Sequence, residues 1–177
     1  DTTLRDGEQM QNVSYTTEEK LTISKLLLTE VKVDRLEITS ARASSGEKES
    51  VKKICEWARE AGYLDKMEIL TFVDQNKSVD WAKNVGIECI NLLTKGSLKH
   101  CLGQLNKNPE EHIKDIEGTI KYARDNNIAV NIYLEDYSHG IKDSPDYVYN
   151  LIDNLSKLNI RRLMLPDTLG IFNPFKT

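Results

Sequence analysis

Short apolar runs and amphipathic segments alternate along the chain. The runs are rich in Val, Ile and Leu, and several are almost continuously apolar, which is typical of parallel strands covered on both faces. Predicted strands occupy residues 33–40, 66–73, 88–95, 128–136 and 161–170. A further strand, the first of six, is expected to be already ending at Asp1.

Between the apolar runs, hydrophobic residues recur with the period of an α-helix. Val51, Ile54, Cys55 and Ala58 stand at i, i+3, i+4 and i+7, and Gly62 provides a stop signal. Helices are predicted after the capping-box pair Thr16 and Glu19, over 46–62, over 79–85, after Pro109, and after an N-cap at Ser144 with Pro145 in the first turn.

This alternation predicts an α/β protein with a parallel sheet covered by helices. An open doubly wound sheet and a (β/α)8 TIM barrel both fit the pattern. The sequence contains no GxGxxG fingerprint and no P-loop, which disfavours a dinucleotide-binding sheet. Polar residues gather where the predicted strands end, the edge at which a barrel carries its active site. They are Arg5, Asp6, Ser40, Arg42, Thr94, Lys95, Glu135, Asp136, Asp167 and Thr168.

The chain is short for a complete barrel. It has 177 residues, whereas a barrel usually needs about 250. Six predicted strands stand where eight are required, and residues 173–177 are expected to begin a helix that is cut off. We therefore expect residues 1–177 to be a partial catalytic barrel domain holding strands 1 to 6, with strands 7 and 8 and any regulatory domain outside it.

Composition narrows the possible functions. Hydrophobic residues make up 39% and charged residues 29%, with a net charge of -4, as in an ordinary globular protein. The sequence shows no basic stripe for nucleic acid and no apolar run of roughly 18 residues for a membrane span. The three cysteines and three histidines lack the spacing of metal-binding motifs, which predicts reduced thiols in a cytoplasmic protein.

The opening stretch DTTLRDGEQ closely resembles the signature of the acyl-CoA-condensing (β/α)8 enzymes, namely 2-isopropylmalate, homocitrate and citramalate synthases. Lyases of the same superfamily share a looser version. Further segments resemble the citramalate synthase branch in the same order, so the resemblance extends over nearly all of the chain. These segments are EKLTISKLLL, VDRLEITSARAS, EILTFVDQNKSVDW, NLLTKGS, YLEDYSHG, DSPDYVYNL and LPDTLG.

The resemblance implies a Claisen-type condensation of acetyl-CoA with a 2-oxo acid, which is pyruvate in the citramalate branch. Isopropylmalate or homocitrate synthesis, acyl-CoA cleavage by a superfamily lyase, and an inactive fragment remain alternatives. It also implies a divalent metal (Mn, Mg or Zn), with two ligands from a seventh strand absent from residues 1–177. A homodimer is expected for the full-length enzyme.

The resemblance assigns a role to each of seven residues. Asp6 would bind the metal, although an ion pair with Arg5 is the simpler interpretation from the residues alone. Arg5 would steady the substrate oxygen as a catalytic and substrate-binding residue. Glu135 would serve as acid or base, partly desolvated at the end of an apolar strand. The four remaining residues would contact the 2-oxo acid or wall the pocket around its side chain: Leu70, Leu93, Tyr133 and Thr168.

Glu8 is a weaker candidate, because its only expected role is to orient Arg5 or a metal ligand. The two leucines and Tyr133 would form a small apolar wall that suits a methyl group better than an isopropyl group. Such a pocket separates substrates by only about 1–3 kcal/mol per methylene.

Overall fold

The computed structural model describes residues 1–173 and 175. Within them, five parallel strands form one sheet in the order β1-β2-β3-β4-β5. Each strand pairs with the next strand along the chain, without the reversal of a doubly wound sheet, so the barrel-like alternative is confirmed. The strands are β1 (Leu36–Ser40), β2 (Met67–Phe72), β3 (Cys89–Lys95), β4 (Ala129–Glu135) and β5 (Arg162–Met164).

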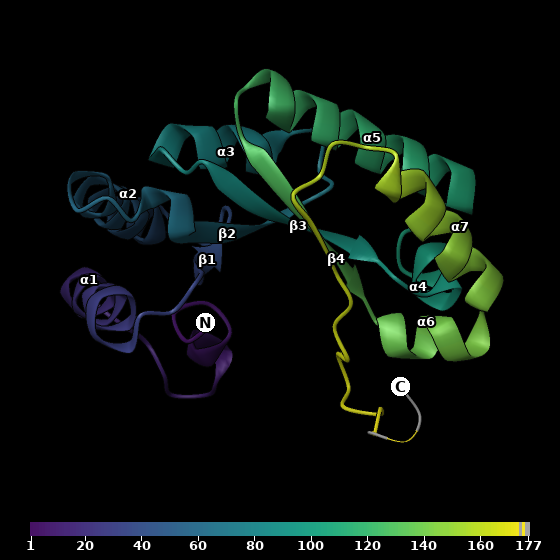
Figure 1. Ribbon diagram of the computed structural model, residues 1–177, viewed down its shortest axis with the longest axis horizontal. Helices are drawn as coiled ribbons and strands as arrows, with labels where there is room; N and C mark the ends of the chain where they lie inside the picture. Colours follow the sequence, from purple (N-terminus) through teal and green to yellow (C-terminus); the bar gives the residue numbers. More distant parts are fainter. Residues whose placement is uncertain (174, 176–177) are drawn as a thin grey trace.

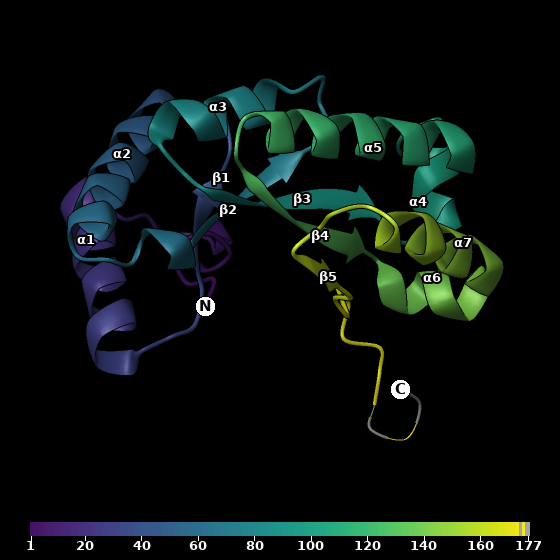
Figure 2. The same cartoon turned by 45° about the horizontal axis from the view of Figure 1, so that its top comes forward.

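Helices follow the strands and lie along one side of the curved sheet (Figures 1 and 2). The longer ones are α1 (Thr17–Leu26), α2 (Ser45–Glu60), α3 (Lys77–Val85), α5 (Pro109–Asp125) and α7 (Pro145–Ser156). Shorter elements are α4 (Leu98–Gly103), α6 (Tyr137–Asp143), the 3-10 turns Gly7–Gln9 and Leu64–Lys66, and the π-helical turn Leu27–Val31. No helix among the described residues is long and apolar enough to cross a membrane.

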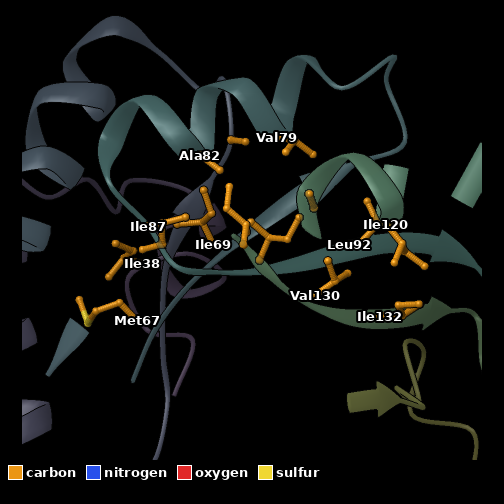
Figure 3. Packing of buried hydrophobic residues seen from close by; sticks show 14 of the residues in the cluster. Ile38, Met67, Ile69, Val79, Ala82, Ile87, Leu92, Ile120, Val130 and Ile132 are labelled. Carbon is orange, nitrogen blue, oxygen red and sulfur yellow. The ribbon is translucent and has the colours of Figure 1, made fainter. Parts of the chain in front are cut away.

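The hydrophobic core lies between the sheet and these helices. Ile38, Ile69, Leu92 and Ile132 come from four different strands and are fully buried. Figure 3 shows them packed with Val79 and Ala82 of α3 and Ile120 of α5. Because side chains alternate along a strand, the residues between these apolar positions point to the opposite, inner face of the sheet.

The predicted helix ends are largely confirmed. Thr16 and Glu19 form a complete capping box at the start of α1, and Gly62 follows α2 with a positive φ of 76°. Ser144 precedes Pro145 at the start of α7, but its hydroxyl donates to Gly140 O and does not cap that helix.

The structure corrects two predicted strands. Residues 3–6 are a turn, not the end of a strand, although the Glu37 N–H still donates to Asp1 O beside β1. The last strand ends at Met164, because Pro166 lacks an N–H for the ladder and Asp167 turns the chain. Its carboxylate accepts from the N–H groups of Ile171 and Phe172.

Three helices differ from the prediction or cannot be compared with it. The short helices α4 and α6 were not predicted, because neither is long enough to show a period. The helix expected over 173–177 falls mainly on residues 174, 176 and 177, which lie outside the described residues.

The inner face of the sheet carries a band of polar side chains. Glu37, Glu68, Asn91 and Asn131 are each at most 5% exposed, so the sheet holds charge in its interior. Asn91 and Asn131 are direct partners in the β3–β4 ladder, and the Asn131 amide donates to Asn91 Oδ1 at 2.8 Å. Arg162 of β5 donates to Glu68 Oε1 at 3.0 Å. The Arg162 contact compensates the buried carboxylate of Glu68, and the bond between the two asparagines satisfies one amide N–H and one amide oxygen.

Candidate active site

A tight turn brings Arg5 and Asp6 to the same place. The N–H groups of Arg5, Asp6 and Gly7 all donate to Thr2 O, at 3.1, 2.8 and 3.2 Å. The side chain of Leu4 is fully buried and anchors this turn in the core. Adjacent residues point to opposite faces of a regular strand, and the turn removes that restriction.

All seven residues proposed from the sequence line one pocket of about 540 Å³ at the carboxyl ends of the strands. The pocket therefore brings together side chains that are far apart in the sequence, from Arg5 to Thr168. Its lining consists of Arg5, Asp6, Gln9, Ser40, Leu70, Phe72, Leu93, Tyr133, Glu135, Pro166, Asp167 and Thr168.

Glu37 holds Arg5 in place and was missed by the sequence analysis. Its carboxylate is 2% exposed and accepts from Arg5 Nε at 2.5 Å. The amide of Asn91 donates to the second carboxylate oxygen. A second donor of Arg5, Nη1, contacts Asp6 Oδ1 at 2.7 Å. The guanidinium is thus fixed from two sides, while its 16% exposed side chain still reaches the pocket.

Leu93 and Tyr133 are direct partners in the β3–β4 ladder, and Phe72 pairs with Leu93 on the other side. These three side chains and the nearly buried Leu70 form the apolar part of the lining. Burial, with the nearby Glu37 charge, raises the pKa of Tyr133 to about 12. The Tyr133 hydroxyl therefore keeps its proton and can donate it to a ligand oxygen.

Glu135 occupies the end of β4 and pairs with Lys95. The two residues are partners in the ladder, and Lys95 Nζ contacts Glu135 Oε2. The side chain of Lys95 is 17% exposed and that of Glu135 is 28% exposed. The sequence predicts a partly desolvated carboxylate at this position but does not predict its lysine partner.

Thr168 lies in the loop after β5, and its hydroxyl is held by Asp136, the residue that follows β4. The Asp136 N–H donates to Thr168 Oγ1 at 2.9 Å. The Thr168 oxygen accepts this bond and keeps its O–H as a donor, and the residue lines the pocket. Asp136 has a left-handed backbone, with a φ of 64°, which turns its N–H toward this loop.

The Asp136 side chain points to a separate cluster behind Thr168. Its Oδ1 lies 2.7 Å from His139 Nδ1, and its Oδ2 lies 3.6 Å from His100 Nε2. Burial alone would raise the pKa of Asp136, but hydrogen bonds from His139 and Ser97 lower it below its usual range. The cluster thus holds a carboxylate next to two imidazoles.

Asp6 is the candidate metal ligand, and its side chain is 59% exposed. Its contact with Arg5 is the ion pair that the residues alone suggested. The described residues contain no group of three or more His, Cys, Asp or Glu side chains that could hold a metal ion. A single carboxylate suits Mg, Mn or Zn, but these ions need several ligands. Within residues 1–173 and 175, Asp6 is therefore not part of a cluster of three or more such side chains.

Glu8 does not orient Arg5. Its carboxylate instead accepts from Lys20 Nζ at 2.6 Å and from the Tyr15 N–H at 3.0 Å. Lys20 also contacts Glu47 at 2.6 Å, and its own side chain is only 1% exposed. This triad fastens the loop after the Arg5–Asp6 turn to helices α1 and α2.

Comparison with known protein families identifies the family of this chain. The profile of the HMGL-like family matches residues 1–177. The chain belongs to the HMGL-like family. The family resemblance inferred from the opening nine residues and the later motifs is thereby confirmed.

Curated relatives in this family include both kinds of synthase. The chain is 33% identical to a 2-isopropylmalate synthase of Saccharolobus solfataricus over 177 residues, which cover 99% of the chain and 44% of the relative. It is 31% identical to (R)-citramalate synthase CimA of Methanocaldococcus jannaschii over 178 residues, covering 100% of the chain and 34% of the relative. The chain thus spans less than half the length of each.

Solved structures of HMG-CoA lyases share the fold. The Bacillus subtilis enzyme matches with a TM-score of 0.69 at 24% identity, covering 99% of the chain and 59% of that structure. The Brucella melitensis enzyme matches with a TM-score of 0.72 at 20% identity, covering 98% and 62%. The consecutive parallel strands of residues 1–173 and 175 thus correspond to part of a (β/α)8 barrel.

Proposed function

We propose that this chain carries the 2-oxo-acid pocket of a synthase that condenses acetyl-CoA with pyruvate to give citramalate and CoA. The observation that carries the proposal is the single pocket lined by a fixed guanidinium, three carboxylates, three hydroxyls and an apolar wall. The proposal is supported by the similar relatives, which are named 2-isopropylmalate synthase and (R)-citramalate synthase.

Arg5 and the hydroxyl groups bind the 2-oxo acid. The Arg5 guanidinium, fixed by Glu37, donates to the keto oxygen and stabilises the negative charge that develops there when the new carbon–carbon bond forms. Thr168 donates its hydroxyl proton to the substrate carboxylate, and Tyr133 donates to a substrate oxygen from the neighbouring strand.

Glu135 acts on the acetyl group. Its carboxylate accepts a proton from the acetyl methyl group, and the resulting carbanion equivalent attacks the keto carbon of the 2-oxo acid. The alkoxide then takes up a proton, and water cleaves the thioester C–S bond to release CoA. Each atom of acetyl-CoA, pyruvate and water is thereby accounted for in citramalate and CoA.

A divalent metal fits the exposed Asp6 carboxylate as one of its ligands, and when bound it would polarise the keto group. The remaining ligands would come from strands outside residues 1–177. We therefore propose that the chain is part of a longer catalytic barrel, inactive alone, which forms a homodimer as the complete enzyme. The three buried free cysteines fit the reducing environment of the cytoplasm.

The apolar wall favours a small substrate side chain. Leu70, Leu93 and Tyr133 leave the substrate end of the pocket lined by bulky groups, which suits the methyl group of pyruvate. Isopropylmalate synthesis from 2-oxoisovalerate is the second candidate, because a relative of that name is as similar as the citramalate synthase. Neither Leu70 nor Leu93 offers a cation for the second carboxylate that homocitrate synthesis requires.

Release of free CoA from acetyl-CoA tests the proposal, using the complete protein supplied with Mn or Mg. Pyruvate, 2-oxoisovalerate and 2-oxoglutarate are compared in parallel, with Asp6→Ala as the inactive variant and Asp125→Asn as a surface control. We expect the highest kcat/KM with pyruvate. A preference for 2-oxoisovalerate would transfer the proposal to isopropylmalate synthesis. Cleavage of a hydroxyacyl-CoA without any condensation would overturn both.

A further inference from the structure

Lys95 faces Glu135 across the inner face of the sheet, where the sequence analysis gave it no role. The two residues are register partners at the carboxyl ends of β3 and β4. Lys95 Nζ contacts the Glu135 carboxylate, and its side chain is 17% exposed. Lys95 is therefore the cation that accompanies the proposed proton acceptor.

The backbone of Lys95 is fixed by side chains from two helices behind the sheet. Its N–H donates to Nε2 of His112 in α5 at 3.2 Å, and its C=O accepts from the hydroxyl of Tyr147 in α7 at 2.8 Å. Burial, helped by the nearby Lys107 charge, lowers the pKa of His112 to about 4. His112 is thus neutral near pH 7, with a ring nitrogen able to accept the bond.

The residue after Lys95 is fixed against Glu135 itself. The Gly96 N–H donates to Glu135 O at 2.7 Å. A Cβ added at Gly96 would lie 2.6 Å from Leu134 O, and one added at Gly140 would lie 1.9 Å from Gly96 O. Only glycine allows this close approach of β3, β4 and α6, so the spacing between Lys95 and Glu135 is set by packed backbone.

We propose that Lys95 is a positioning residue, which holds the Glu135 carboxylate in the orientation in which it receives the proton from acetyl-CoA. This inference rests on the proposed function. The ion pair restrains a carboxylate that is otherwise free to rotate at the end of its strand. Lys95 does not line the pocket, so it acts through Glu135 and not on the substrate.

Kinetics of the complete protein test this role through the separation of kcat from KM. Lys95→Met should lower kcat by roughly 10–100-fold, the usual cost of losing a group that orients a reacting side chain, and leave the KM for pyruvate within about twofold. Lys95→Arg retains a cation and should recover part of kcat. Lys121→Met removes a lysine from another, exposed ion pair, with Asp125, and should leave kcat unchanged.

A double-variant comparison decides whether Lys95 acts through Glu135. Glu135→Gln should lower kcat by about 10²–10⁴-fold, and adding Lys95→Met to it should cause no further loss. A second, multiplicative loss in the double variant, or a raised KM for pyruvate in Lys95→Met, would overturn the inference because Lys95 would then act on the substrate.

The outcomes separate this inference from the proposed function. Full activity of Glu135→Gln, or no CoA release by the wild type with any 2-oxo acid, contradicts the proposed function itself. Loss of activity in Glu135→Gln with full activity in Lys95→Met contradicts only the role of Lys95. If Lys95→Met unfolds at the same temperature as Lys121→Met, a loss of kcat in Lys95→Met does not come from unfolding.

Discussion

Arg5 and Glu37 lie thirty-two residues apart in the sequence and 2.5 Å apart in space, joined by the Nε–H donor and the Oε1 acceptor. The carboxylate is buried and the guanidinium reaches the pocket. The buried negative charge of Glu37 is therefore compensated by Arg5, at the site where the substrate oxygen is proposed to bind.

Removal of the negative charge of Glu37 should weaken catalysis. Glu37→Gln keeps the shape of the side chain but replaces the charged acceptor of Arg5 with a neutral amide that holds the guanidinium less firmly, so we expect kcat to fall by roughly 10–100-fold. CoA release by the complete protein measures the effect. Glu117→Gln changes an exposed carboxylate of α5 and should have no effect. Equal activity of the two variants would show that Glu37 does not fix Arg5.

The triad of Glu8, Lys20 and Glu47 should contribute strongly to stability. Lys20→Met leaves two carboxylates without their shared cation, and such a loss typically costs 3–5 kcal/mol in the free energy of unfolding. Thermal unfolding should show a clear fall in Tm. Lys121→Met disrupts the exposed pair with Asp125 and should change stability by less than about 1 kcal/mol. Similar Tm values for the two variants would contradict this prediction.

His112 should make the fold sensitive to acid. Its pKa is about 4 in the folded chain and near 6.5 when unfolded, so between these pH values the unfolded state binds a proton that the folded state does not. The associated stability is present above pH 6.5 and is lost as the pH falls to about 4; it amounts to at most about 3 kcal/mol. His112→Gln keeps an acceptor for Lys95, and its Tm should fall less over this range. Parallel Tm curves for wild type and variant would refute the assignment.

Gly140 should tolerate no side chain. An added Cβ would overlap Gly96 O, so Gly140→Ala should destabilise the protein by about 3 kcal/mol and lower kcat by displacing the segment beside Glu135. Gly118→Ala is the matched control, because nothing lies within 4 Å of a Cβ at that exposed position of α5. Alanine there should stabilise the helix by about 0.5–1 kcal/mol. A stable, active Gly140→Ala would disprove the close backbone contact.

The sequence predicted the strands and the site better than the contacts within the site. Apolar runs and helical periods are local, so β2, β3 and β4 lie within a residue or two of their predicted bounds. All seven site residues lie in one pocket because strand ends converge at one edge of a barrel. Glu37 was not predicted, and Lys95 was predicted only as a strand-end residue, because their partners Arg5 and Glu135 are brought to them by the tertiary fold.

The consecutive strand order has a consequence for how the molecule forms. Every pair of strands joins neighbours in the chain, so each βα unit can dock on the previous one as soon as it leaves the ribosome. The pocket cannot form one βα unit at a time, because its lining residues come from both ends of the chain. Its first wall, Arg5 and Asp6, is synthesised long before Thr168 arrives after β5. The nascent chain therefore carries an incomplete pocket, with the Arg5 charge already compensated by Glu37, until β5 and Thr168 are added.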